Sequence, residues 1–103
     1  MLFAWLFISL CVSASAQEYH TIKGIVVDAN TSAPIAGVNI IGKYLYAISA
    51  DNGEFVIKNV TAGKHRFEIT HIGYGHEHFT VEIGQNDVKG LTIRLKESIT
   101  NLD

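Results

Sequence analysis

Apolar and polar residues alternate along much of the chain after residue 17. In 67–69, 79–83 and 91–95 every second residue is apolar, and the residues between are charged or Thr. A period of two is typical of strands with one face on a core and one face in water. The pattern predicts seven strands, at approximately 19–28, 37–42, 46–50, 54–59, 65–72, 76–83 and 89–96.

Residues that favour turns separate these runs. The segment 29–34 ends in Pro34, which cannot donate to a sheet ladder, and Asp51-Asn52-Gly53 predicts a tight hairpin with positive φ at Gly53. Seven short strands at such spacing predict an all-β fold, a seven-stranded antiparallel β-sandwich of Ig-like or transthyretin-like type. The expected interior comprises Val26, Val38, Ile40, Phe55, Ile57, Phe67, Ile69, Val81, Leu91 and Ile93.

The first sixteen residues form a segment of a different kind. Residues 2–12 are apolar apart from Ser9, and small residues ending in Ala16 follow. We therefore expect a signal peptide at 1–16, cleaved before Gln17, since a spanning helix needs about 20 apolar residues. Lipid attachment at Cys11 is the alternative, but Leu10 stands where a small residue is needed. The expected domain is 17–96, and 97–103 begins a linker.

Composition narrows the function classes. The chain has 103 residues, 48% of them hydrophobic and 17% charged, and its net charge is −2. This composition is globular rather than disordered, and no basic cluster of the kind that binds nucleic acid is present. No cysteine remains after residue 16, which suits an exported protein that does not depend on disulfides.

Candidate chemistry is sparse. His76 and His78 lie on one strand face and would offer two metal ligands, but a solvated face is the stronger interpretation because Thr80 and Glu82 share it. No Gly-x-Ser-x-Gly elbow, the motif of one class of serine hydrolases, occurs. Together with the weak metal candidate, this leads us to predict no catalytic residue, no metal site and no cofactor. Side-chain bonds to turn amides explain Asp28 and Asp51 better than catalysis does.

Two further features each leave an alternative open. The pair His65-Arg66 invites comparison with transthyretin-like hydroxyisourate hydrolases, but the C-terminal Tyr-Arg-Gly-Ser of that family is missing. The run Tyr44-Leu45-Tyr46 is either an exposed contact patch or simply the start of a strand.

Five short motifs in order resemble the carboxypeptidase-regulatory-like domain. They are Gly24-Ile-Val-Val-Asp28, Pro34-Ile-Ala-Gly37-Val-Asn-Ile, Asp51-Asn-Gly53-Glu-Phe55-Val-Ile, Gly63, and Ile72-Gly73-Tyr74. The resemblance covers about 24–95 and marks ten positions as its structural motif: Gly24, Asp28, Pro34, Gly37, Asp51, Gly53, Phe55, Gly63, Gly73 and Tyr74. The chain departs from the family at 44–50, which is more apolar than usual.

A signal peptide followed at once by this domain is similar to the front of SusC-like (RagA-like) TonB-dependent outer-membrane transporters. The resemblance implies a non-catalytic periplasmic domain that precedes a TonB box, a plug and a barrel. The implied partners are proteins of the cell envelope: the rest of the same transporter, a surface lipoprotein or the TonB system. The alternative is a stand-alone or differently attached binding module of a secreted or surface protein, such as a peptidase.

Overall fold

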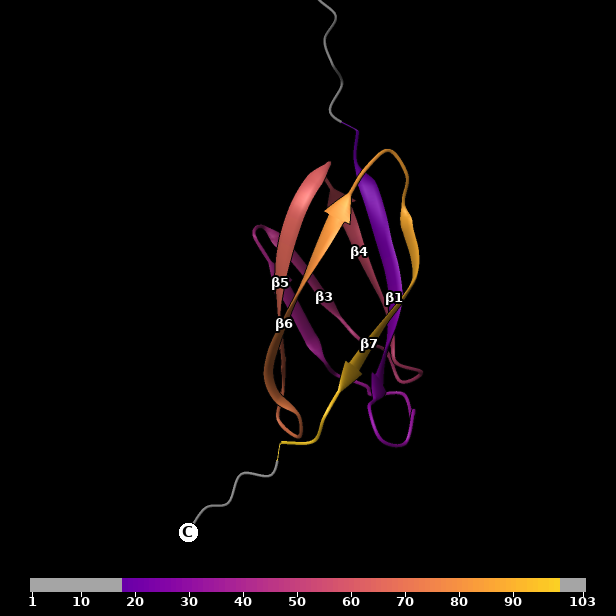
Figure 1. Cartoon of the computed structure of the whole chain (residues 1–103), viewed down its shortest axis with the longest axis vertical. Helices are drawn as coiled ribbons and strands as arrows, with labels where there is room; N and C mark the ends of the chain where they lie inside the picture. The colour runs from indigo at the N-terminus through magenta and orange to yellow at the C-terminus, as the bar shows by residue number, and fades with distance from the viewer. Residues whose placement is uncertain (1–17, 99–103) are drawn as a thin grey trace, which may run out of the picture.

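Two β-sheets packed face to face make up the computed structural model, which describes residues 18–98 (Figure 1). The predicted signal peptide and most of the predicted linker lie outside these residues. Within them no helix is long and apolar enough to cross a membrane. The seven strands are β1 (His20–Asp28), β2 (Asn39–Gly42), β3 (Leu45–Ile48), β4 (Glu54–Val60), β5 (Gly63–His71), β6 (Gly75–Ile83) and β7 (Val88–Leu95).

The predicted all-β sandwich is confirmed, and each strand end lies within about two residues of its predicted place. One sheet has the order β4-β1-β7 and the other the order β3-β2-β5-β6. The antiparallel prediction holds for four of the five strand pairs, but β1 and β7 are parallel. The reason is that 84–87 crosses between the sheets at the end where β1 starts, so β7 runs in the same direction as β1 (Figure 1).

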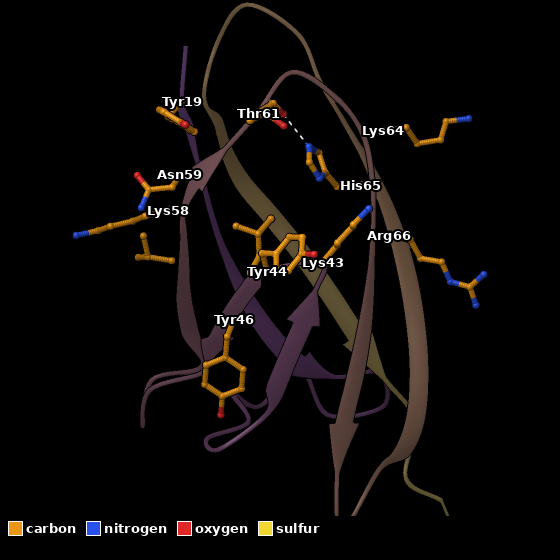
Figure 2. A pocket seen from close by; sticks show the side chains of 12 residues that line it. Tyr19, Lys43, Tyr44, Tyr46, Lys58, Asn59, Thr61, Lys64, His65 and Arg66 are labelled. Atoms are coloured by element: carbon orange, nitrogen blue, oxygen red, sulfur yellow. Dashed lines mark hydrogen bonds between the residues drawn. The ribbon is translucent and has the colours of Figure 1, made fainter. Parts of the chain in front are cut away.

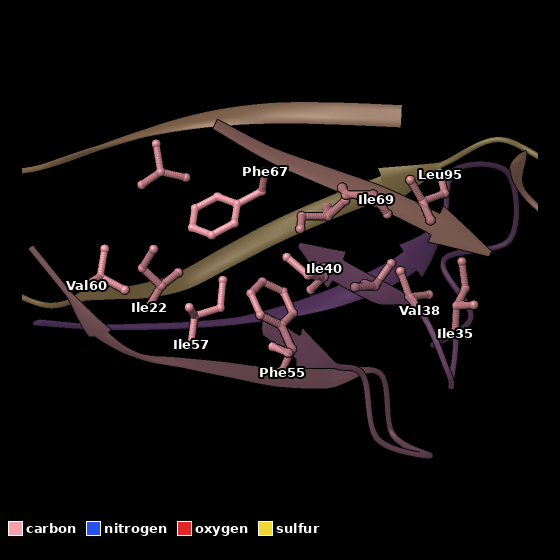
Figure 3. Packing of buried hydrophobic residues seen from close by; sticks show 14 of the residues in the cluster. Ile22, Ile35, Val38, Ile40, Phe55, Ile57, Val60, Phe67, Ile69 and Leu95 are labelled. Carbon is pink, nitrogen blue, oxygen red and sulfur yellow. The ribbon is translucent and has the colours of Figure 1, made fainter. Parts of the chain in front are cut away.

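The core lies between the sheets and follows the alternation (Figure 3). Phe67 is fully buried, and its ring stacks on Phe79 with centroids 5.2 Å apart. Nine of the ten predicted interior residues are buried, whereas Leu91 is only partly buried against the cluster. The prediction missed the buried residues Ile22, Val27, Ile35, Ala47, Val60, Ile83 and Leu95.

The turn at Asp51-Asn52-Gly53 is tight but does not make the predicted hairpin within one sheet. β3 and β4 belong to different sheets, so the turn carries the chain across the sandwich. Gly53 N donates to Ala50 O, and Gly53 O accepts from Val26 N at 2.8 Å, which attaches the turn to β1.

Ser49 directly follows β3, before this turn. Its hydroxyl donates to Ile35 O at 2.7 Å and accepts from Val38 N at 2.9 Å, and the side chain is buried. These bonds satisfy a buried polar group and hold the chain where it leaves one sheet for the other.

Phe55→Ala should lower the free energy of unfolding by about 3–5 kcal/mol, because it leaves a cavity in the core. Phe55 is 2% exposed, whereas its neighbour Val56 is 41% exposed and serves as the control. Val56→Ala should cost about 1 kcal/mol or less. Urea unfolding of residues 17–103 measures both, and equal losses would contradict the core placement of Phe55.

Gly53→Ala should destabilise the domain more than Gly37→Ala. Both glycines have positive φ, 80° and 72°, where an L side chain costs roughly 1–2 kcal/mol. Only at Gly53 would the added Cβ also lie 2.6 Å from Val26 O and 2.9 Å from Pro34 Cβ, while nothing lies within 4 Å at Gly37. Thermal unfolding of the two variants measures the difference, and equal melting temperatures would show that the close approach at Gly53 is relieved without cost.

Candidate functional site

Asp28, the last residue of β1, joins the two sheets at the end of the sandwich where β1 and β7 finish. One carboxylate oxygen accepts from the backbone N–H of Asn30 at 2.7 Å and of Thr31 at 3.0 Å. The other accepts from the hydroxyl of Tyr74 at 2.7 Å, in the turn between β5 and β6 of the opposite sheet. The predicted bonding of Asp28 to turn amides is confirmed, and the bond to Tyr74 adds a contact between the sheets.

The electrostatics of this pair favour a fixed protonation state. The Tyr74 hydrogen bond, followed by the Thr31 and Asn30 amides, holds the pKa of Asp28 below its usual value. The same bond, together with desolvation, raises the pKa of Tyr74 to about 12. Asp28 is therefore a carboxylate and Tyr74 a neutral phenol at neutral pH, which suits a structural bond and not proton transfer.

Several other motif residues gather around β1. A Cβ at Gly24 would lie 2.3 Å from Leu91 O and 2.6 Å from the tip of the Phe55 ring, so only glycine fits under that ring. Pro34 forms an isolated bridge with Val27 of β1. With Gly53 bonded to Val26, the motif surrounds the last half of β1.

The remaining motif residues are spread over separate turns. Gly37 and Gly63 have positive φ with open space around them, and Gly73 N donates to His71 Nδ1 at 3.0 Å. Asp51 is exposed, and the side-chain bond of its turn comes from Asn52, whose Oδ1 accepts from Glu54 N at 3.0 Å. The predicted turn-amide bond of Asp51 is therefore wrong, since Asn52 makes it instead.

His20 and His76 lie close to different carboxylates and do not share one site. The buried ring of His20 lies 3.3 Å from Asp87, whose pKa is lowered chiefly by the backbone N–H of Thr21. His76 contacts the carboxylate of Glu68 on the neighbouring strand. Within residues 18–98 no three His, Cys, Asp or Glu side chains converge as a metal site would require. The outer face that carries His76 and His78 is exposed, as the solvated-face interpretation expected.

The hairpin between β2 and β3 displays one aromatic side chain to solvent. Gly42 pairs with Leu45, which leaves Lys43 and Tyr44 as the two connecting residues. Tyr44 has a φ of 60°, a conformation usually taken by Gly, Asn or Asp, and its side chain is 95% exposed. The Lys43 ammonium lies 5.9 Å from the centroid of the Tyr44 ring.

Beside this hairpin lies an open groove of about 950 Å³ between β4 and the first half of β5 (Figure 2). Figure 2 shows Tyr44 between the two rims, with Lys58 and Asn59 on the β4 side and Lys64 on the β5 side. We call this surface the cationic groove. Its full lining is Tyr19, Lys43, Tyr44, Leu45, Tyr46, Val56, Lys58, Asn59, Thr61, Lys64, His65 and Arg66.

The sequence indicated only the hairpin part of this surface. Tyr44 and Tyr46 belong to the run that the sequence left as either a contact patch or the start of a strand. β3 does begin at Leu45, and the two tyrosines are 95% and 60% exposed. Lys58 and Lys64 lie on two strands of different sheets, so their local sequence does not indicate that they line one groove.

The fold and the contacts around β1 define a two-sheet β-sandwich whose turns are attached to its first strand. The family model described as "CarboxypepD_reg-like domain" matches residues 22–103. The chain therefore belongs to the CarboxypepD_reg-like family, in agreement with the resemblance of its motifs. No curated protein matches the chain.

Three solved structures share the fold. A chain of the type II cohesin–X-dockerin complex of Acetivibrio cellulolyticus is 29% identical, with a TM-score of 0.59 over 74% of this chain and 56% of that one. The minor pilin of Streptococcus agalactiae is 17% identical, with a TM-score of 0.64 over 84% and 48%. A DUF3823 family protein of Parabacteroides merdae is 16% identical, with a TM-score of 0.51 over 80% and 47%. The chain spans about half the length of these chains.

Tyr74→Phe should destabilise the domain more at pH 7 than at pH 3. The pKa of Asp28 is lowered in the folded state, so its contribution to stability is present above its unfolded pKa of about 3.9 and is lost as pH falls through the lower folded value. The pKa of Tyr74 is raised to about 12 in the folded state, so the contribution of Tyr74 to stability is lost only as pH rises above about 10.

Tyr46→Phe is the matched control, because the Tyr46 hydroxyl donates to the uncharged amide oxygen of Asn39 at 2.6 Å. Its effect should be the same at both pH values. Urea unfolding at pH 3 and pH 7 measures both variants, and a pH-independent loss for Tyr74→Phe would contradict the coupling to Asp28.

Proposed function

We propose that this chain is the non-catalytic N-terminal domain of a SusC-like TonB-dependent outer-membrane transporter, on the periplasmic side of the membrane. The observation that carries the proposal is the order of features: an apolar, signal-like segment followed directly by a CarboxypepD_reg-like sandwich. The domain acts by contact with envelope proteins and modulates uptake. Nutrients such as glycans or peptides bind elsewhere in the transporter.

A non-catalytic role agrees with the chemistry of the described residues. Asp28 is occupied by three hydrogen bonds, and His71 is held between Gly73 N and the Ala36 carbonyl, to which its Nε2 lies at 3.1 Å. Groups satisfied by the fold in this way are poorly available as acid, base or nucleophile. The polar side chains therefore support structure and contact.

A second candidate is a β-sandwich module attached to another kind of surface protein. The similarity to a chain of a cohesin–X-dockerin complex, at 29% identity, favours it, because that chain takes part in a complex between proteins. The coding sequence downstream of Asp103 discriminates between the two, since only the first candidate requires a TonB box, a plug and a barrel.

Deletion of residues 24–95 from the full-length gene should reduce or retune nutrient uptake while the barrel still accumulates in the outer membrane. A domain whose core is self-contained can be removed without unfolding its neighbours. Barrel abundance and growth on defined nutrients measure the effect, with the re-inserted wild-type segment as control. A downstream gene without plug or barrel would contradict the transporter, and unchanged uptake on every nutrient would contradict modulation.

A further inference from the structure

We propose that the cationic groove binds an extended, acidic peptide segment of a partner protein, which pairs with the exposed strand edges along it. This inference rests on the proposed contact role and specifies the surface and the chemistry of the partner. Three independent observations support it: the charge of the groove, the free strand edges and the backbone conformation of its lining.

The groove is positive although the protein as a whole carries a net charge of −2. Lys43, Lys58, Lys64 and Arg66 line it, and none of its lining residues within 18–98 is Asp or Glu. Among the described residues Arg66 pairs with Glu68 at 3.7 Å, while the three lysines form no ion pair. A concave surface with several cations and no carboxylate is complementary to an acidic ligand.

Each wall of the groove, among the described residues, includes a strand segment that has a neighbouring strand on one side alone. β4 is the outer strand of its sheet and pairs only with β1. β2 pairs with β5 only from Glu68 to Thr70, so 63–67 has a strand partner on the β6 side alone in the part of the chain described. Unpaired backbone N–H and C=O groups on such edges bind extended peptides by strand addition. This favours a peptide over an acidic polysaccharide, because a polysaccharide has no row of peptide N–H and C=O groups that could pair with a strand edge.

Two residues that line the groove have a backbone conformation that is rare for residues other than glycine. Three non-glycine residues in 18–98 have positive φ, and two of them, Tyr44 and Asn59, line the groove. Glycine would fit the Tyr44 position with less strain, and the ring gains little from packing because it is 95% exposed. A strained residue that stabilises the fold so little is better explained by a contact that the ring makes with a ligand.

Tyr44 and its neighbours suit an extended peptide in particular. Exposed tyrosines supply large contact area at low entropic cost, and Tyr19 and Tyr46 are also more than half exposed. The lysines on the two sides of the groove would bind acidic side chains of the added strand. Tyr44, which lies between these sides, would contact its backbone.

The test uses residues 17–103, since the core is formed wholly by residues within 22–95. The probe is a fluorescein-labelled ten-residue peptide in which Glu and Thr alternate, titrated by fluorescence anisotropy. One control peptide replaces each Glu with Gln, and another carries Pro at two central positions, which blocks strand pairing. We expect saturable binding of the first peptide and at least tenfold weaker binding of both controls.

Two variants place the binding in the groove. Lys43→Glu with Lys58→Glu should weaken binding at least tenfold, whereas Lys23→Glu with Lys96→Glu makes the same charge change outside the groove and should leave it within twofold. Tyr44→Gly should weaken binding at least threefold while raising the melting temperature, because it removes the ring and relieves the positive φ. Circular dichroism of each variant checks that it is folded.

Some outcomes would overturn the proposal. These are no binding of the acidic peptide, equal binding of the proline peptide, equal loss in the two charge-reversed pairs, or preference for an oligogalacturonate over the peptide. A change in sedimentation that shows two copies occupying each other's groove would also overturn it. The assay uses the isolated domain, so its failure is distinguishable from failure of the transporter role, which the full-length deletion tests.

Discussion

The last residues of β1 hold together every segment at the C-terminal end of the sandwich. Val26 N donates to Gly53 O and Val26 O accepts from Ile35 N, so one residue ties the β3–β4 crossing and the β1–β2 loop to the central strand. Two residues further on, Asp28 fixes its own turn and bonds to Tyr74 of the other sheet. The relative position of the two sheets depends on this short stretch.

Local pattern was sufficient for the strands and for most of the core, because period-two burial is a property of a strand and its immediate neighbours. It was not sufficient for the pairing of the strands. The turn at Gly53 has hairpin residues, yet Ser49 and Val26 take the chain to the opposite sheet through contacts distant in sequence. The parallel pairing of β1 with β7 depends in the same way on where 84–87 crosses, which alternation does not encode.

The candidate site was predictable to a smaller extent. The role of Asp28 could be predicted because an aspartate before a turn accepts hydrogen bonds from the turn amides. Its partner Tyr74 lay in the family motif, but the sequence did not indicate what it contacts. The cationic groove was visible only as the tyrosines of 44–46. Its lysines come from the β2–β3 turn, β4 and β5, which are far apart in the sequence. The positive φ at Tyr44 is unusual for tyrosine, so residue type alone predicts against it.

The parallel arrangement of the first and last strands has a mechanical consequence. β1 begins at one end of the sandwich and β7 finishes at the other, so the chain enters and leaves at opposite ends (Figure 1). Tension applied between those two points acts along the strands and loads the hydrogen bonds from Gly24–Leu91 to Asp28–Leu95 together, in shear. A sandwich with antiparallel terminal strands would instead open one bond at a time, so this parallel pairing gives the sandwich greater resistance to tension along its long axis.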